Sequence, residues 1–306
     1  MPSRKKLPCS HTGETSLGRR DNRRTMMSSA FVFWLELALK MALTATVVVI
    51  TSIVVERAGP FVGALIAALP TAAGAAYVIL AIEHPPAFIA TSAVGSIATG
   101  AAVSIFGAIY AALAQRRGLV VSLGVGLAAW FAVTAVLRQF VFTPLGAIAL
   151  NAAVFAVTIP LSWRYRISGP PKQFLRTAFD IPLRALAAAV VVAAVTTAST
   201  SIGSFASGMF ALFPIIFCRS IVILHPRVGG KATASMVAYA QVAFIGLALS
   251  FVAVHYLAEP LGSWWALAIG LLIAIGWSGF LFLVRSRALA RESGSNNKLK
   301  RDTETT

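Results

Sequence analysis

Residues 88–113 read FIATSAVGSIATGAAVSIFGAIYAAL and contain no charged side chain. A helix needs roughly 20 predominantly apolar residues, at a rise of about 1.5 Å per residue, to cross about 30 Å of hydrocarbon. This stretch is therefore long enough to span a bilayer. Its apolar residues are continuous and do not alternate with polar ones, which favours a helix over a strand of a membrane barrel. The stretch predicts a transmembrane helix.

The composition of the whole chain agrees with this prediction. Of 306 residues, 58% are hydrophobic and 12% are charged, and the mean hydropathy is +0.82, whereas a soluble domain is about 25% charged. Similar apolar runs recur along the chain and predict an all-α integral membrane protein with nine transmembrane helices. The predicted spans are 31–55, 61–82, 88–113, 119–137, 141–162, 181–201, 205–224, 232–257 and 263–284.

The basic residues predict how the chain is oriented. A net charge of +16 would suit a nucleic-acid partner, but most of the Lys and Arg residues lie in the two tails and in short segments between the spans. Membrane proteins keep such residues on the cytoplasmic side. We therefore expect the lipid bilayer of the plasma (inner) membrane, and no nucleic acid, as the partner. The N-terminus is expected outside and the C-terminus in the cytoplasm, which leaves Arg138 as the only basic residue in an outside loop between spans.

Both ends of the chain are polar. Residues 1–30 are basic and predict a disordered tail, and the methionines at 26 and 27 leave open whether residues 1–25 are translated. Residues 286–306 predict a polar cytoplasmic tail. Between the tails we expect a first repeat at 31–137, a linking span with a basic loop at 138–180, and a second repeat at 181–285.

The two halves match at an offset of 144 residues. Ala68-Leu69-Pro70 aligns with Leu212-Phe213-Pro214, and Leu39-Lys40 aligns with Leu183-Arg184. After a three-residue gap, His84-Pro85 aligns with His225-Pro226. Because an odd number of spans separates the two copies, they would be related by inverted topology, which is typical of secondary transporters.

Short motifs in each half resemble the GlpM-like small inner-membrane proteins. These motifs are Leu39-Lys40-Met41-Ala42, Val62-Gly63-Ala64-Leu65, Leu69-Pro70-Thr71 and Phe213-Pro214, within residues 36–137 and 181–284. The resemblance implies a four-span unit in each half and no particular substrate. This chain differs in being a fused double copy with an added span, and its second half lacks the Thr that follows Pro70.

Pro70 and Pro214 predict a solute-binding site near mid-membrane. A proline inside a helix removes a backbone hydrogen bond and frees carbonyl groups that can contact a ligand. Matching breaks in two repeats are typical of transport sites, although a plain kink would also explain them. The neighbouring polar candidates are Thr71, Tyr77, Cys218 and Ser220.

Arg219 is the candidate for binding an anionic group. A charge inside a span is costly and normally faces a cavity or a partner, and a guanidinium can hold an anion bidentately. The alternative is that Arg219 reaches to the membrane surface. Glu36 and Lys40 are four residues apart on the first predicted span, and this spacing predicts a structural ion pair.

No catalytic or metal-binding motif is present. The four histidines lack HExxH spacing, no Cys/His cluster occurs, and no phosphate-binding loop is found. We therefore expect no enzyme activity, no metal and no cofactor. The sequence predicts a secondary transporter or exporter of a small solute, with anions among the candidates. The alternative is a non-transporting accessory protein for envelope assembly or polymer production. The sequence leaves homo-oligomer formation open.

Overall fold

The computed structural model describes residues 71–166 and 201–304, together with scattered positions between 35 and 46 and between 186 and 199. Every regular element in these described ranges is an α-helix. Some predictions lie wholly or mostly outside the described residues. These are the spans 31–55 and 181–201, the first part of span 61–82, Pro70, and the pair Glu36 and Lys40.

The described helices follow the predicted spans closely. They are α3 (Thr71–Glu83), α4 (Pro86–Leu113), α5 (Leu119–Leu137), α6 (Pro144–Trp163), α8 (Ser204–Ala211), α9 (Ile215–Val228), α10 (Gly230–Leu261) and α11 (Ser263–Glu304). Five segments are long and apolar enough to cross a membrane: α4, α5, α6, α10 and the part of α11 that ends at Val284. The chain is thus an all-α membrane protein.

Two boundaries differ from the sequence-based prediction. Helix α11 continues through the predicted polar tail to Glu304, because Lys, Arg, Leu and Ala in this segment are good helix formers. The predicted span 205–224 ends too early, since α9 continues through Pro226 to Val228 and the helix ends before Gly229. Gly229 has a φ of 88°, a conformation that glycine adopts without steric cost.

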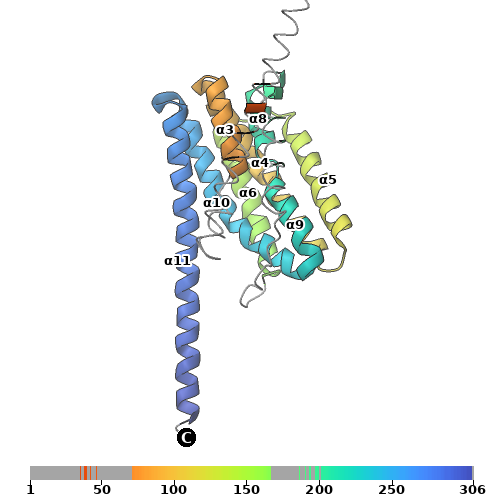
Figure 1. The fold of residues 1–306 in the computed structure, drawn as a ribbon, viewed down its shortest axis with the longest axis vertical. Helices are drawn as coiled ribbons and strands as arrows, with labels where there is room; N and C mark the ends of the chain where they lie inside the picture. Colours follow the sequence, from red (N-terminus) through yellow and green to blue (C-terminus); the bar gives the residue numbers. More distant parts are fainter. Residues whose placement is uncertain are drawn as a thin grey trace, which may run out of the picture.

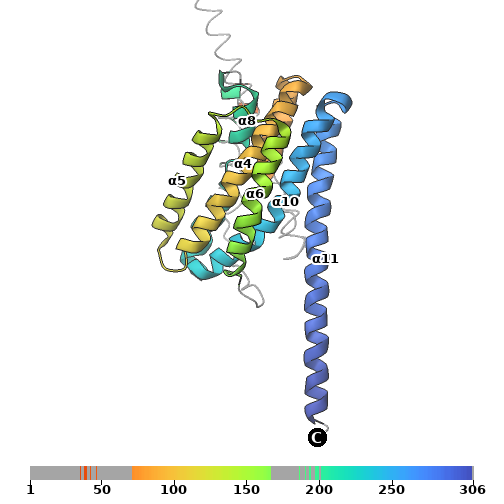
Figure 2. The same cartoon turned by 180° about the vertical axis from the view of Figure 1, so that it is seen from behind.

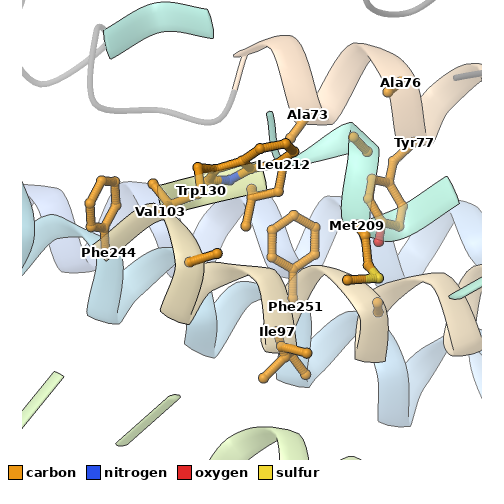
Figure 3. Packing of buried hydrophobic residues seen from close by; sticks show 14 of the residues in the cluster. Ala73, Ala76, Tyr77, Ile97, Val103, Trp130, Met209, Leu212, Phe244 and Phe251 are labelled. Carbon is orange, nitrogen blue, oxygen red and sulfur yellow. The ribbon is translucent and has the colours of Figure 1, made fainter. Parts of the chain in front are cut away.

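Helix α4 occupies the centre of the bundle. It packs against α3, α5, α6, α8 and α10, and most of its residues are buried. Figures 1 and 2 show α5 along one edge of the bundle and α11 along the opposite edge. The buried side chains around α4 form one apolar cluster (Figure 3).

Small residues let α4 and α8 approach each other closely. Gly95 faces the backbone oxygen of Phe205, and Gly208 faces the backbone of Ser92, without room for a Cβ atom on either glycine. Ser92 Oγ donates to the Ser204 carbonyl at 2.9 Å. Such close approach through small residues replaces the hydrophobic driving force that lipid cannot supply between helices.

A polar clamp joins α4, α6 and α10. Ser104 Oγ lies 2.7 Å from Thr158 Oγ1 and donates to Gln241 Oε1 at 2.7 Å. Gln241 Nε2 donates back to the Ser104 carbonyl at 2.9 Å. All three side chains are buried. The clamp holds α6, which is the central span of the predicted nine, against one helix from each half of the chain.

The two ends of the bundle differ in charge. The turns at 114–118 and at Gly229 lie at the same end as the C-terminus, where α6 also ends (Figure 1). The turns and helix ends described here carry the basic residues Arg116, Arg117, Arg164, Arg166, Arg227 and Lys231. The opposite end carries Glu83, Arg138 and Glu259.

Candidate functional site

The predicted break at Pro214 is present in the structure. Helix α8 ends at Ala211 and α9 begins at Ile215, with Pro214 as its N-cap. Phe213 N donates to the Phe210 carbonyl at 3.0 Å, and Ile215 N donates to the Phe213 carbonyl at 2.7 Å. Because the Ile215 N–H is used in this tight turn, the Ala211 carbonyl loses the donor that a continuous helix would provide.

Trp130 of α5 supports the break from the side. Its ring lies 5.0 Å from the Phe213 ring in an edge-to-face arrangement, and its side chain is fully buried. The indole N–H has no hydrogen-bond partner among the described residues. Trp130 therefore contacts the non-helical segment through ring packing.

A small hollow lies beside this broken segment, between α4, α6 and α10. It has room for about one water molecule, and we call it the Asn151 hollow. Its lining comes from four parts of the chain. The lining residues are Ser96, Gly100, Val103, Asn151, Leu212, Phe244, Leu247, Ala248 and Phe251.

Asn151 is the most polar residue of the lining. Its side chain is 3% exposed, and Nδ2 donates to the Ile97 carbonyl at 2.7 Å. This bond fixes the orientation of the amide, because a carbonyl oxygen requires a donor opposite it. The other amide atom, Oδ1, is buried and has no hydrogen-bond partner in the described part of the chain. A residue that lines the hollow thus has a hydrogen-bond acceptor that no described residue uses.

Gly100 explains how Asn151 can lie there. A Cβ atom at position 100 would be 2.6 Å from Asn151 Nδ2, which is too short for a non-bonded contact. The absence of a side chain at this position makes space for the amide against α4. The donor and the unused acceptor of Asn151 are therefore both positioned by the backbone of α4.

Ser96 provides the second polar group of the lining. Its Oγ donates to the Gly208 carbonyl at 2.8 Å and lies 2.7 Å from Tyr77 Oη. Because the Ser96 proton is used for Gly208, the Tyr77 hydroxyl must donate to Ser96. The Tyr77 ring packs 5.2 Å from that of Phe251. Every hydrogen-bond donor in this part of the lining is already in use.

Histidines lie near the two ends of the bundle. His84 Nε2 is 2.9 Å from Ser199 Oγ at one end, and His225 Nδ1 is 2.9 Å from Tyr110 Oη at the other. No group of three His, Cys, Asp or Glu side chains that could hold a metal occurs within the described part of the chain.

Comparison with protein-family models, curated proteins and solved structures found no match to this chain. Its function is therefore argued from the geometry.

The structure distributes the predicted site residues over two regions. Pro214 is buried at the break, and Tyr77 is one hydrogen bond away from the hollow. Cys218 and Ser220 are partly buried on α9, and Thr71 is the first residue of α3. None of these residues lines the hollow, but Leu212, two residues before Pro214, does.

Arg219 lies away from the hollow. It is two residues from Ile221, which is fully buried, and a helix turns by about 100° per residue. Arg219 therefore lies on nearly the opposite face of α9 from Ile221. It is partly buried, and its Nε atom has no hydrogen-bond partner among the described residues.

Sequence reasoning missed Asn151, Ser96 and Gln241. Asn151 is the only Asn in the predicted span 141–162, and Gln241 is the only Gln in 232–257. Uncharged amides in a span form hydrogen bonds between helices, and this signal was available in the sequence.

Proposed function

We propose that the chain is a secondary transporter of a small solute, without enzymatic activity, and that the solute passes the Asn151 hollow. The single observation that carries this proposal is a helix broken at Pro214 beside a buried hollow with an unused polar atom. Backbone that is not helical is tolerated at membrane depth only where protein or a cavity satisfies it. Interrupted helices at such cavities form the substrate sites of many transporters.

The proposal includes two inverted repeats of four spans and a total of nine spans. Burial on α5 and α11 supports it, since the buried positions recur 144 residues apart. Ser122, Gly126, Trp130 and Thr134 on α5 correspond to Ala266, Gly270, Ala274 and Ser278 on α11. Such a match is expected when each helix packs against its own repeat in the same way.

Helix contacts give a second, independent support for the repeats. Gly126 contacts Phe106, and Gly270 contacts Ser250, which again lies 144 residues after its counterpart. Helix α3 packs against α11, and α9 packs against α5, which is the same contact with the two halves exchanged. Each proposed repeat also contains motifs that resemble those of the GlpM-like small inner-membrane proteins.

The hollow lies where the proposed repeats meet. Its walls come from α4 of the first repeat, α10 of the second and α6 between them. In an inverted-repeat transporter, the repeats rock against each other around such a site. The room for one water molecule then corresponds to a closed state, and solute entry requires the walls to separate.

Replacing Pro214 by alanine tests this proposal. Alanine restores a backbone N–H and favours a continuous helix from α8 into α9. We expect uptake of radiolabelled solutes into proteoliposomes to fall at least tenfold. The expression level and the size-exclusion elution profile of the variant should stay normal. The panel should contain uncharged solutes and small anions, because the solute is not identified in advance.

Pro160→Ala is the control for a proline that does not interrupt a helix, since Pro160 lies inside α6 and is exposed. It should retain uptake. Full uptake by Pro214→Ala would contradict the role of the helix break in transport. No uptake of any solute by the unaltered protein would contradict a transport role altogether. The accessory role in envelope assembly or polymer production would then be the better explanation.

The proposed orientation places the basic end of the bundle in the cytoplasm of a plasma (inner) membrane, with the N-terminus outside. Reporters after Gly118 and at the C-terminus are expected to be cytoplasmic, because the basic turns lie at this end. Reporters after Pro86 and after Phe140 are expected outside. Protease protection of intact cells measures all four positions. A reporter after Pro86 on the same side as the C-terminus would contradict the orientation.

A further inference from the structure

We infer that the solute is uncharged and donates a hydrogen bond to Asn151 Oδ1. This inference rests on the proposed transport function and specifies its substrate class. It follows from the charge, the hydrogen-bonding capacity and the shape of the Asn151 hollow.

The lining excludes a charged ligand. No residue of the hollow carries an ionisable side chain, and Arg219 is not among the lining residues. Moving a charge out of water into such a site costs several kcal/mol unless a counter-charge compensates it. An anion would also meet Asn151 Oδ1, an oxygen with partial negative charge that has no partner among the described residues. Charge and polarity therefore both act against an anionic solute.

Asn151 Oδ1 requires a hydrogen-bond donor on the solute. Asn151 Nδ2 donates one of its two hydrogens to the Ile97 carbonyl, and the Ser96 proton is bound to the Gly208 carbonyl. Asn151 Oδ1 is an acceptor that has no partner among the described residues. Only an O–H or N–H group can satisfy it. Leaving such an acceptor buried and unpaired costs about 1–3 kcal/mol, and a bound donor would recover this free energy.

The remaining walls suit a compact, partly apolar molecule. Val103, Phe244 and Phe251 provide aliphatic and aromatic surface in the lining. Leu212 belongs to the turn between α8 and α9, so it is the lining residue that lies outside a helix. A movement of this turn would enlarge the hollow without breaking a helix. The class of solute is therefore small alcohols, ureas or amides.

Uptake by full-length protein in proteoliposomes tests the inference with three probes. Urea and glycerol are small uncharged donors, and acetate is an anion of similar size. We expect the unaltered protein to carry urea or glycerol above the rate of protein-free liposomes and not to carry acetate. The Asn151→Leu variant keeps the side-chain size and removes the acceptor, so it should lower this uptake at least tenfold. A binding site built around a hydrogen bond loses at least this much activity toward its ligand when one partner of the bond is removed.

Gln139→Leu is the matched control, because Gln139 is an exposed amide at the end of α5. It should retain uptake within about twofold, since surface substitutions usually have small effects. If Asn151→Leu fails to fold, Asn151→Ala removes the amide without adding volume and replaces it in the assay.

The outcomes separate this inference from the transport proposal. Acetate uptake that survives Asn151→Leu and is lost in Arg219→Ala would overturn the uncharged class and leave transport intact. Urea or glycerol uptake unaffected by Asn151→Leu would overturn the role of Asn151. Failure of all three probes and of the wider panel would overturn both proposals.

Discussion

Replacing Gly208 by leucine is expected to prevent the bundle from assembling. A Cβ atom at position 208 would overlap the backbone of Ser92 on α4, and a backbone cannot move aside as a flexible side chain can. Leucine would force α8 away from α4 and break the hydrogen bonds from Ser92 to Ser204 and from Ser96 to Gly208. Overpacking alone typically costs about 1–3 kcal/mol, and the lost contacts add to this cost.

Size-exclusion profiles in detergent and thermal unfolding measure the effect. We expect aggregation of the Gly208→Leu protein or a large fall in its unfolding temperature. Gly124→Leu is the control, since Gly124 is an exposed helical glycine on α5 with no atom within 4 Å of its Cβ position. Equal stability of the two variants would show that α4 and α8 do not approach as described.

Replacing Trp130 by alanine is expected to cause the next largest loss. The side chain is fully buried and contacts the Phe131 and Phe213 rings, both at 5.0 Å. Removal of a buried Trp from a core costs about 3–5 kcal/mol. Within lipid most of this cost is lost van der Waals packing. Because Phe213 belongs to the break, the non-helical segment should also lose its fixed position, and solute uptake should fall together with stability.

Two controls isolate the cause. Trp264→Ala removes the same side chain from an exposed position and should have little effect. Trp130→Phe keeps an aromatic ring and removes an N–H that has no partner, so it should retain most of the stability. Thermal unfolding and proteoliposome uptake are measured on all three variants. An unfolding temperature of Trp130→Ala equal to that of Trp264→Ala would contradict the packing role of Trp130.

The positions of the described helices could be predicted from the sequence. The physical constraint is strict, because a span must cover the hydrocarbon thickness and satisfy its backbone within one helix. The apolar stretches 88–113 and 119–137 therefore predicted α4 and α5. The interruption at Pro214 was also predictable, since proline lacks the N–H that a helix requires.

Composition thus determined the class of the protein, the described spans and the break, because these depend on length, hydropathy and local backbone chemistry. Only the tertiary structure decided which faces meet. The spans are apolar on every side, so no polar stripe indicates that Asn151 lies over Gly100 or that Arg219 lies away from the hollow. Those relations depend on how closely neighbouring helices approach, and that distance is set by pairs such as Gly208 and Ser92, which are 116 residues apart in the chain.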